Sequence, residues 1–381
     1  MFLYINFFVD QLWNRWRHGC VTPLYKCFSW RHFKNYHAAL RRHFDVRRNL
    51  PIIKFFKFPR CFTLVRHDVS RMLISFIIFI CVITNLNAQD SITLDYLLDK
   101  IETQQLKHND FFIEGVFPSY INASRKFKTK KKDNTIFYNT LVVYTLKNNY
   151  SKFNHEQKII VDSIIARSEK ASKYFKNKTR NTYNFWRTDT ATKFHYSWWL
   201  PILNGNSALP DDMDDTVLGL LMNNENKDSA EEFHQFMQAY INSKPPLKTT
   251  YKIYKNEPAY STWFGKKFPV VFDVSVMCNV LSFVQENNLQ WTKADSASLQ
   301  YIIKTIQRDD IEKHPAFVSP YYANTSIILY HLARLMDIKP INELEKIKPK
   351  LIQIANERLH ETDNMFEKIM LSLALIKWNQ Q

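Results

Sequence analysis

The scarcity of glycine constrains the fold more than any other feature of this sequence. Only five of its 381 residues are glycine, whereas globular proteins average roughly 7%. The five stand far apart, at Gly19, Gly115, Gly205, Gly219 and Gly265. Because nucleotide-binding loops need closely spaced glycines, the absence of any G-x-G-x-x-G or G-x-x-x-x-G-K pattern excludes Rossmann and P-loop sites.

Hydrophobic periodicity after residue 88 predicts helices. Apolar residues recur at intervals of three and four from Leu94 to Ile101 and from Ile136 to Leu146, where Asp133 is the expected cap of the second helix. Almost nothing alternates with a period of two. We therefore predict an all-α domain over residues 89–381, an α/α toroid of five to six helical hairpins, with a plain bundle or solenoid as the alternative. Further helices are expected near 155–175, 213–223, 229–242, 273–287, 294–307, 322–336, 342–358 and 362–378.

Positive charge is concentrated in residues 1–71. This segment contributes +11 to the formal net charge of +16, and the remainder contributes only +5. A basic tract with interleaved aromatic residues suits a phosphate-bearing or anionic membrane surface. It is equally typical of an extension upstream of the true start, which is the interpretation we favour. We expect no nucleic-acid partner, and membrane contact only through residues 1–88.

Residues 72–88 have the pattern of an export signal. Met72 is followed by mostly apolar residues from Leu73 to Leu86 and then by Asn-Ala-Gln. This run has the length of a signal-peptide core and is shorter than the roughly 20 residues of a membrane span. If Met72 initiates translation, the mature chain begins near Gln89; if Met1 does, the run is a short anchor. Either way the main domain is predicted to be exported, with a buried core segment as the alternative.

One segment is chemically distinctive. The sequence from Ala208 to Leu218 places four carboxylates in five residues directly before an apolar helical run. Carboxylates this close cannot all ionise cheaply away from water, so at least one is expected to keep its proton. The alternative is ordinary capping, because a helix N-terminus stabilises ionised carboxylates. The four are Asp211, Asp212, Asp214 and Asp215.

This acidic segment resembles the D-x-D-D-T motif of class II terpene cyclases and squalene-hopene cyclases, which are built on α/α toroids. The matching residues are Asp212, Asp214, Asp215 and Thr216. The resemblance gives Asp214 the role of the acid that protonates an isoprenoid double bond, with Asp212 and Asp215 as its hydrogen-bonding neighbours.

Three other segments extend the resemblance over roughly residues 180–340. Residues 260–265 (YSTWFG) look like the S-W-F-G piece of these cyclases. Residues 273–281 and 319–334 look like segments of exported proteins with prenyltransferase and squalene-oxidase-type repeats. The glycine-dependent Q-W repeats of squalene cyclases are absent.

The same acidic residues also satisfy a second motif. Asp211, Asp212 and Asp215 fit D-D-x-x-D, which holds magnesium and diphosphate in class I prenyl enzymes. The nearest second motif, at 309–312, is one residue short. Pro210 and Thr216 fit class II better, so we expect no metal and no other cofactor.

Aromatic residues gather around the acidic segment in the sequence. Their faces suit the stabilisation of a carbocation, the stacking of sugars, or simple packing. Asn279 is included among the candidates because an amide in an apolar helix needs a partner. The candidate substrate-binding residues are Trp198, Trp199, Tyr260, Trp263, Phe264, Asn279, Tyr321 and Tyr322.

The sequence thus predicts an exported toroid with a class II-like acid site centred on Asp214, or a degenerate ligand-binding relative. Its expected partner is an apolar isoprenoid-like molecule or a glycan. The alternatives are an exported α/α-barrel polysaccharide hydrolase or lyase, with a second carboxylate across an open groove, and a non-catalytic helical interaction domain. The last alternative predicts that the Asp side chains face solvent and cap their helix.

Overall fold

The computed structural model describes residues 93–124, 129–189, 209–224, 226–244, 247, 250–265 and 268–380. These residues form twelve α-helices, two short 3-10 helices and one two-stranded sheet. Leu97–Gln381 belongs to one compact unit. The prediction of an all-α architecture is confirmed for the described residues. The predicted N-terminal extension, the export signal, Trp198 and Trp199 lie outside them.

The helices follow the predicted positions closely. The largest difference is in the helix predicted at 229–242, which spans Lys227–Met237. At the helix predicted at 322–336, Asn324 accepts a hydrogen bond from the Ser326 backbone N–H, so the helix starts at Thr325. The helices are α4 (Leu94–Gln104), α5 (Phe137–Asn148), α6 (His155–Ser172), α8 (Met213–Met222), α9 (Lys227–Met237), α10 (Val274–Glu286), α11 (Lys293–Gln307), α12 (Asp310–Lys313), α13 (Pro315–Val318), α14 (Thr325–Ile338), α15 (Asn342–Glu361) and α16 (Met365–Lys377), with 3-10 turns η1 (Tyr150–Lys152) and η2 (Lys252–Tyr254).

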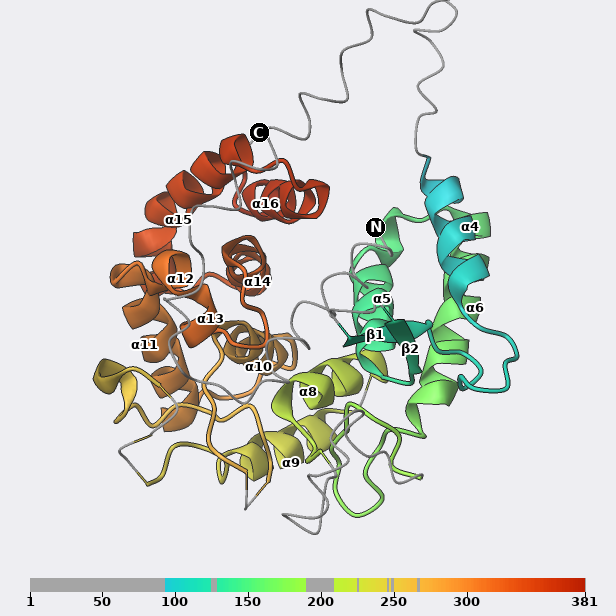
Figure 1. The fold of residues 1–381 in the computed structure, drawn as a ribbon, viewed down its shortest axis with the longest axis horizontal. Helices are drawn as coiled ribbons and strands as arrows, with labels where there is room; N and C mark the ends of the chain where they lie inside the picture. The colour runs from blue at the N-terminus through green and yellow to red at the C-terminus, as the bar shows by residue number, and fades with distance from the viewer. Residues whose placement is uncertain are drawn as a thin grey trace, which may run out of the picture. The chain divides into compact units, whose positions relative to one another are not determined.

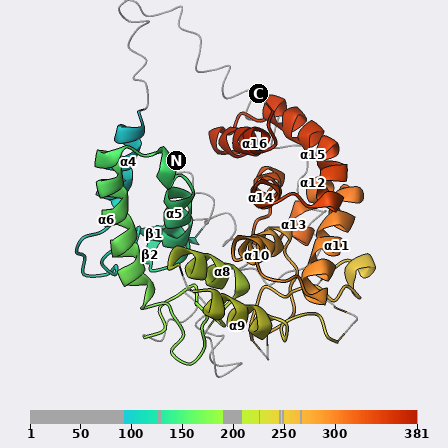
Figure 2. The same cartoon turned by 180° about the vertical axis from the view of Figure 1, so that it is seen from behind.

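Five helices pack side by side in the order α5, α8, α10, α14 and α16. A second set of helices packs on the outer side of this row: α6 packs on α5, α11 on α10, and α15 on both α14 and α16. Figures 1 and 2 show this row and its outer partners from opposite sides. The alternation of a row helix with an outer helix along the chain is the arrangement of helical hairpins.

The amino-acid sequence of α10 explains why this helix lies at the centre of the row. Every residue from Val274 to Gln285 is buried, as expected for a helix that is apolar on all sides. Met277, Cys278 and Leu281 belong to a hydrophobic cluster with α11, α14, α15 and α16. Val280 and Phe283 belong to a second cluster with α5, α8 and α9. Helix α10 therefore joins the two halves of the core.

Two local predictions were wrong. Asp133 does not cap α5: the residue before that helix is Ile136, without a side-chain cap, and the Asp133 carboxylate accepts a hydrogen bond from Trp186 Nε1 at 2.9 Å. The lysine-rich sequence of residues 126–132 (KFKTKKK) predicts a solvated loop, with a basic contact surface as the alternative. Its residues 129–132 instead lie in strand β2 (Thr129–Asp133), which pairs antiparallel with β1 (Ser119–Ser124), because strand pairing outweighs the low strand propensity of lysine.

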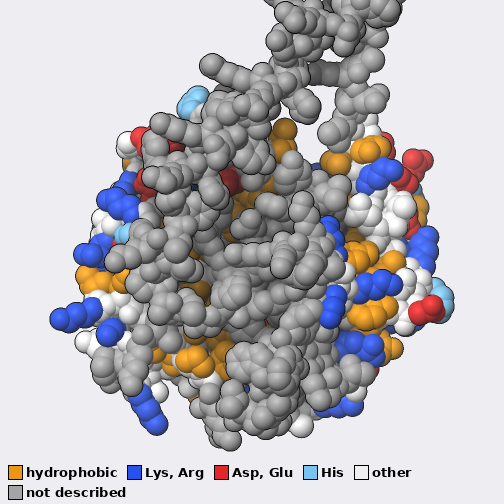
Figure 3. All heavy atoms as spheres, in the orientation of Figure 1, with side chains coloured by type: hydrophobic (Ala, Val, Ile, Leu, Met, Phe, Trp, Pro, Cys, Tyr) orange, Lys and Arg blue, Asp and Glu red, His pale blue; other side chains and the backbone are white. Residues whose placement is uncertain are grey.

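Charge on the described surface is dispersed. Where Figure 3 shows described residues, Lys and Arg side chains are interspersed with hydrophobic side chains and some acidic ones. None of the helices in the described part of the chain has the length and apolar character needed to cross a membrane.

Candidate functional site

The acidic segment forms the start of α8, and its first turn is a capped N-terminus. Asp212 has an extended backbone, and its Oδ1 accepts a hydrogen bond from the Asp215 backbone N–H at 2.8 Å. The Thr216 hydroxyl donates to the Asp212 carbonyl at 2.6 Å. Capping therefore accounts for Asp212, as ordinary helix chemistry predicts, but for none of the other three carboxylates.

The structure places the two motif segments next to each other. Asp212 and Trp263 form an antiparallel bridge, in which the Met213 N–H donates to the Thr262 carbonyl at 2.8 Å and the Phe264 N–H donates to the Asp211 carbonyl at 3.0 Å. The sequence resemblance thus joins two segments that are in contact in the fold.

The Asp211 carboxylate is bonded to residues 177–184 and not to the other carboxylates of the acidic segment. Its Oδ2 accepts from Arg180 at 2.6 Å and from the Thr182 hydroxyl at 2.6 Å, and it forms an ion pair with Arg180. Asn177 and Asn184 complete its partners. Both carboxylate oxygens of Asp211 therefore have hydrogen-bond partners in residues 177–184, an arrangement that the sequence does not predict.

Asp214 is the carboxylate of α8 whose hydrogen-bond partners lie on other elements. Its Oδ1 accepts from Asn279 Nδ2 at 2.5 Å, on α10, and its Oδ2 accepts from the hydroxyl of Tyr322, just before α14. The side chain therefore joins three elements of the helix row instead of capping α8. Both partners are among the residues that the sequence singled out.

All four carboxylates are buried, with exposures of 4% for Asp211, 4% for Asp212, 7% for Asp214 and 3% for Asp215. This contradicts the placement expected of a non-catalytic interaction domain, in which these side chains face solvent. Asp215 Oδ1 is buried without a hydrogen-bond partner, which is costly for an ionised carboxylate and much less so for a neutral acid.

Burial sets the electrostatics of the site. It raises the pKa of Asp214, against the lowering effects of Tyr322, Asn279 and Arg334. Burial also raises the pKa of Asp212 and Asp215, and the neighbouring carboxylates of the cluster raise both further. Because like charges in a dry site oppose each other's ionisation, the cluster holds at least one proton at neutral pH.

One buried cation accompanies these acids. Arg334, on α14, is 5% exposed and donates from Nη2 to Asn279 Oδ1. Its guanidinium lies over the ring of Tyr144 at 5.0 Å, and the Tyr144 hydroxyl donates to Glu286 Oε1 at 2.5 Å. Sequence reasoning missed Arg334, although a lone arginine in the apolar run of residues 327–336 is the same kind of signal that pointed to Asn279.

A histidine also lies beside the site. The ring of His331 packs edge to face against Tyr322, with centroids 4.8 Å apart. Burial, with a contribution from Arg334, lowers the pKa of His331 to about 3. Its Nδ1 carries the proton, since it bonds the Ile327 carbonyl at 2.9 Å and a carbonyl can only accept. His331 is therefore neutral next to the acid.

The other aromatic candidates divide into two groups. Trp263 Nε1 donates to the Tyr321 hydroxyl at 2.6 Å, and the two rings meet edge to face, so this pair lies beside the acidic segment and Tyr322. Tyr260 and Phe264 belong instead to the core between α9, α10 and α11. The Tyr260 hydroxyl is held by Asp295 and Gln238, which indicates a structural role for that residue.

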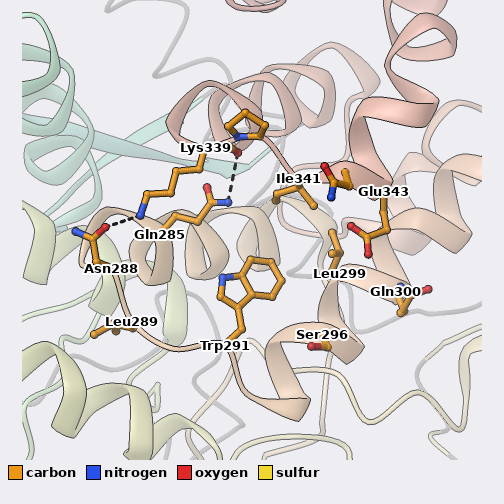
Figure 4. Close-up of a pocket in the computed structure, with 12 residues that line it drawn as sticks. Gln285, Asn288, Leu289, Trp291, Ser296, Leu299, Gln300, Lys339, Ile341 and Glu343 are labelled. Atoms are coloured by element: carbon orange, nitrogen blue, oxygen red, sulfur yellow. Dashed lines mark hydrogen bonds between the residues drawn. The ribbon is translucent and has the colours of Figure 1, made fainter.

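A cavity of about 530 Å³ lies elsewhere, between the α10–α11 and α14–α15 connections. Trp291 and Gln285 point into it, and Lys339 Nζ, at its edge, donates to Asn288 (Figure 4). None of the predicted site residues that the structure describes lines it.

Within the described ranges, no group of three or more His, Cys, Asp and Glu side chains is arranged to hold a metal ion. The three residues of the D-D-x-x-D motif do not converge, because Asp211 turns towards residues 177–184 and Asp212 caps α8.

No protein-family model, curated protein or solved structure matches this chain.

Proposed function

We propose that this protein is an acid catalyst for an apolar, unsaturated ligand of the isoprenoid type, with Asp214 as the proton donor. The observation that carries the proposal is the placement of Asp214: it is buried, and it is bonded across the helix row to Asn279 and Tyr322 instead of capping α8. A carboxylic acid kept neutral by a dry site has a proton to donate at neutral pH, and its transfer to an alkene becomes accessible when the site stabilises the resulting cation.

The chemical step follows from the residues around the acid. Asp214 transfers its proton to a carbon of the ligand's double bond; the π electrons form the new C–H bond and leave a carbocation, which closes a ring by accepting electrons from a second double bond. Loss of a proton to solvent ends the reaction, and Asp214 regains its own from solvent. Asn279 and Tyr322 donate hydrogen bonds to the carboxylate that forms, and aromatic faces stabilise the cation.

The helix row supports a toroidal fold as part of the same proposal. Helices α5, α8, α10, α14 and α16 form consecutive neighbours, and all of them except α8 pack on an outer helix, which is α6, α11 or α15. Asp214, Asn279 and Arg334 all belong to members of that row. In an α/α toroid the inner row surrounds the ligand cavity, so this placement suits an acid that acts inside the ring.

Glycoside cleavage is less well supported. It needs two carboxylates that flank the bond from opposite sides, whereas the carboxylates nearest to Asp214 in sequence, Asp212 and Asp215, share its helix turn. Export of the domain remains part of the proposal, resting on the pattern of residues 72–88.

Solvent deuterium tests the reaction. The full chain is incubated in D₂O with squalene, with polyprenols and, separately, with soluble glycans, and products are analysed by mass spectrometry. We expect a cyclised isoprenoid with one deuterium from the initial protonation, and at least a hundredfold less of it, about 3 kcal/mol in barrier, from Asp214→Asn. Asp211→Asn is the matched control, because it makes the same change at a residue bonded to Arg180. Equal turnover in the two variants, or release of reducing sugar from glycans, would reject the proposal.

A further inference from the structure

Arg334 is an unusual residue to find inside this helix row. It is 5% exposed, its Nε has no hydrogen-bond partner, and among the described residues the structure records no direct ion pair to its guanidinium. Burial of a cation of this kind is unfavourable unless other groups compensate for its lost hydration. Its contacts are the Asn279 amide and the Tyr144 ring.

The contact with Asn279 fixes how that amide is turned. A guanidinium has only donors, so the group of Asn279 that faces Arg334 must be the oxygen. The NH₂ group must then face Asp214 Oδ1, which lies at 2.5 Å. The orientation of the Asn279 amide is therefore set by the Arg334 guanidinium, which can only donate hydrogen bonds.

This orientation makes the two oxygens of Asp214 different. Oδ1 faces an N–H donor and serves as an acceptor in both protonation states, because a proton placed on it would oppose that donor. Oδ2 faces the Tyr322 hydroxyl, which can either donate or accept. The hydroxyl donates to the ionised acid and accepts from the neutral one. The acidic proton therefore belongs on Oδ2.

We propose that Arg334 is a positioning residue for Asp214, which acts through the Asn279 amide to keep the transferable proton on Oδ2 beside Tyr322. This inference rests on the proposed function for the identity of the acid, but the arrangement itself concerns only residues of this chain. In the transfer step, the Oδ2–H bond breaks, its proton forms the C–H bond with the ligand, and the electron pair stays on Asp214. Asn279 already donates to Oδ1 and needs no rearrangement.

Several other charged or titratable groups surround Asp214 and enter its titration. Asp212 and Asp215 come from its own helix turn, and Asp273 precedes α10. Tyr322 and His331 come from the α14 region, and Glu286 acts on Arg334 through Tyr144. A test must therefore separate the path through Asn279 from the general effect of removing a positive charge.

A double-mutant cycle read by infrared titration makes that separation. The carbonyl band of protonated Asp214 in the full chain is assigned by its loss in Asp214→Asn and followed against pH, without substrate. We expect Arg334→Gln and Asn279→Leu each to raise the midpoint of the Asp214 titration by about one pH unit, a tenfold change in the ionisation constant. In the Asn279→Leu background, Arg334→Gln should have a smaller effect, because the path through the amide is broken and only the direct charge effect of Arg334 on Asp214 is left. Arg334→Lys retains a donor for Asn279 Oδ1 and should restore most of the original midpoint.

The controls keep the test decisive. Ser282→Ala alters a buried hydroxyl on the same helix that has no hydrogen-bond partner, and should leave the titration unchanged. If Arg334→Gln does not fold, Arg334→Lys and Asn279→Leu still test the path. An equal shift from Arg334→Gln with and without Asn279 would overturn the inference, since it would show a direct field effect. The titration uses no substrate, so an equal shift would count against the role of Arg334 and not against the proposed reaction. Absence of deuterated product would count against the proposed reaction and not against the role of Arg334.

Discussion

Tyr322 donates a hydrogen bond to Asp214 Oδ2 across 108 residues of chain. The bond joins the N-terminal turn of α8 to the segment that leads into α14, and Asn279 of α10, which lies between those helices in the row, binds the other oxygen. A carboxyl group held from two other elements in this way has a fixed position. That rigidity is what a proton donor needs if it is to meet one carbon of a flexible ligand.

Tyr322→Phe tests this relationship with the loss of a single oxygen. The change leaves Asp214 Oδ2 buried without that donor, so we expect the free energy of unfolding to fall by about 1–3 kcal/mol. The Tyr322 hydrogen bond lowers the pKa of Asp214, so its removal should raise the midpoint of the Asp214 titration. Denaturant unfolding and infrared titration measure the two effects.

Tyr321→Phe is the matched control, because Tyr321 is adjacent and its hydroxyl accepts from Trp263 instead. It should cost a similar amount of stability without moving the Asp214 titration. If both variants shift the titration alike, the bond to Tyr322 has no specific part in setting the acidity.

Most of the helices were predictable because their signals are local. The apolar stripes at intervals of three and four placed helices such as α10 and α11 within one residue of their bounds. The β1–β2 pair was not predicted, although its two strands are close in the sequence, because lysine disfavours strands and β2 (Thr129–Asp133) lacks apolar alternation. Closure of the row into a ring depends on contacts between distant helices, so it stays a prediction.

The candidate site was predictable in part. Asp214 and Asn279 were recognisable because a dense acidic cluster and an amide in an apolar run are chemically costly unless paired. Arg334 bears the same signal and was overlooked. Tyr260 shows what the sequence does not reveal: it lies close to a motif in the sequence, but its hydroxyl is bonded to Asp295 of α11 and not to the acidic segment.

Asp215→Asn should stabilise the folded protein at alkaline pH. Burial, with the charges of Asp212 and Asp214, raises the pKa of Asp215. An acid whose pKa is higher in the folded state contributes stability that is fully present below its unfolded pKa of about 3.9 and is lost as the pH rises through the folded value. An amide at this position carries no charge, so the stability of the variant should fall less between pH 5 and 9, by about 1 kcal/mol or more.

Asp211→Asn should have the opposite effect, although it lies four residues away. It breaks the ion pair with Arg180, and we expect a loss of about 2 kcal/mol at neutral pH. Urea unfolding of both variants over this pH range measures the contrast. Equal stability changes would mean that the two carboxylates share one environment, contrary to their separate hydrogen-bond partners.

Gly219→Ala probes how α8 is held in place. A Cβ built on Gly219 would lie 2.7 Å from Cδ2 of the Tyr183 ring, which is 1% exposed and has little freedom to move. We expect a loss of about 1–3 kcal/mol from overpacking. Calorimetry should show recovery of part of that loss in the Gly219→Ala, Tyr183→Leu double variant, which makes room for the methyl group. A fully additive loss would show that the ring is not the obstacle.

Asp273 tests whether the position of Tyr322 depends on the cap of α10. Asp273 Oδ1 accepts from the backbone of Ser275 and Val276, which caps the helix, while its Oδ2 accepts from the Tyr321 N–H at 2.8 Å. One carboxylate thus anchors the turn that presents the next residue, Tyr322, to Asp214. In Asp273→Asn the amide keeps one oxygen for the cap and turns its NH₂ towards the Tyr321 N–H, so two donors oppose each other.

We expect this variant to be less stable by about 1–3 kcal/mol at pH 8 and to raise the midpoint of the Asp214 titration, because Tyr322 is no longer held against Oδ2. The difference should change with pH. Burial raises the pKa of Asp273 to about 6, so the native protein loses stability between about pH 4 and 6 as this acid ionises in the fold, having ionised earlier in the unfolded chain. The variant lacks that loss, so the difference in free energy of unfolding between the native protein and the variant should decrease from about pH 4 to pH 6 and stay constant above it. Asp309→Asn serves as the control, since it alters a more exposed carboxylate paired with Lys313 and Lys350. If this control shifts the Asp214 titration as much as Asp273→Asn does, the cap of α10 has no specific effect on the acidity of Asp214.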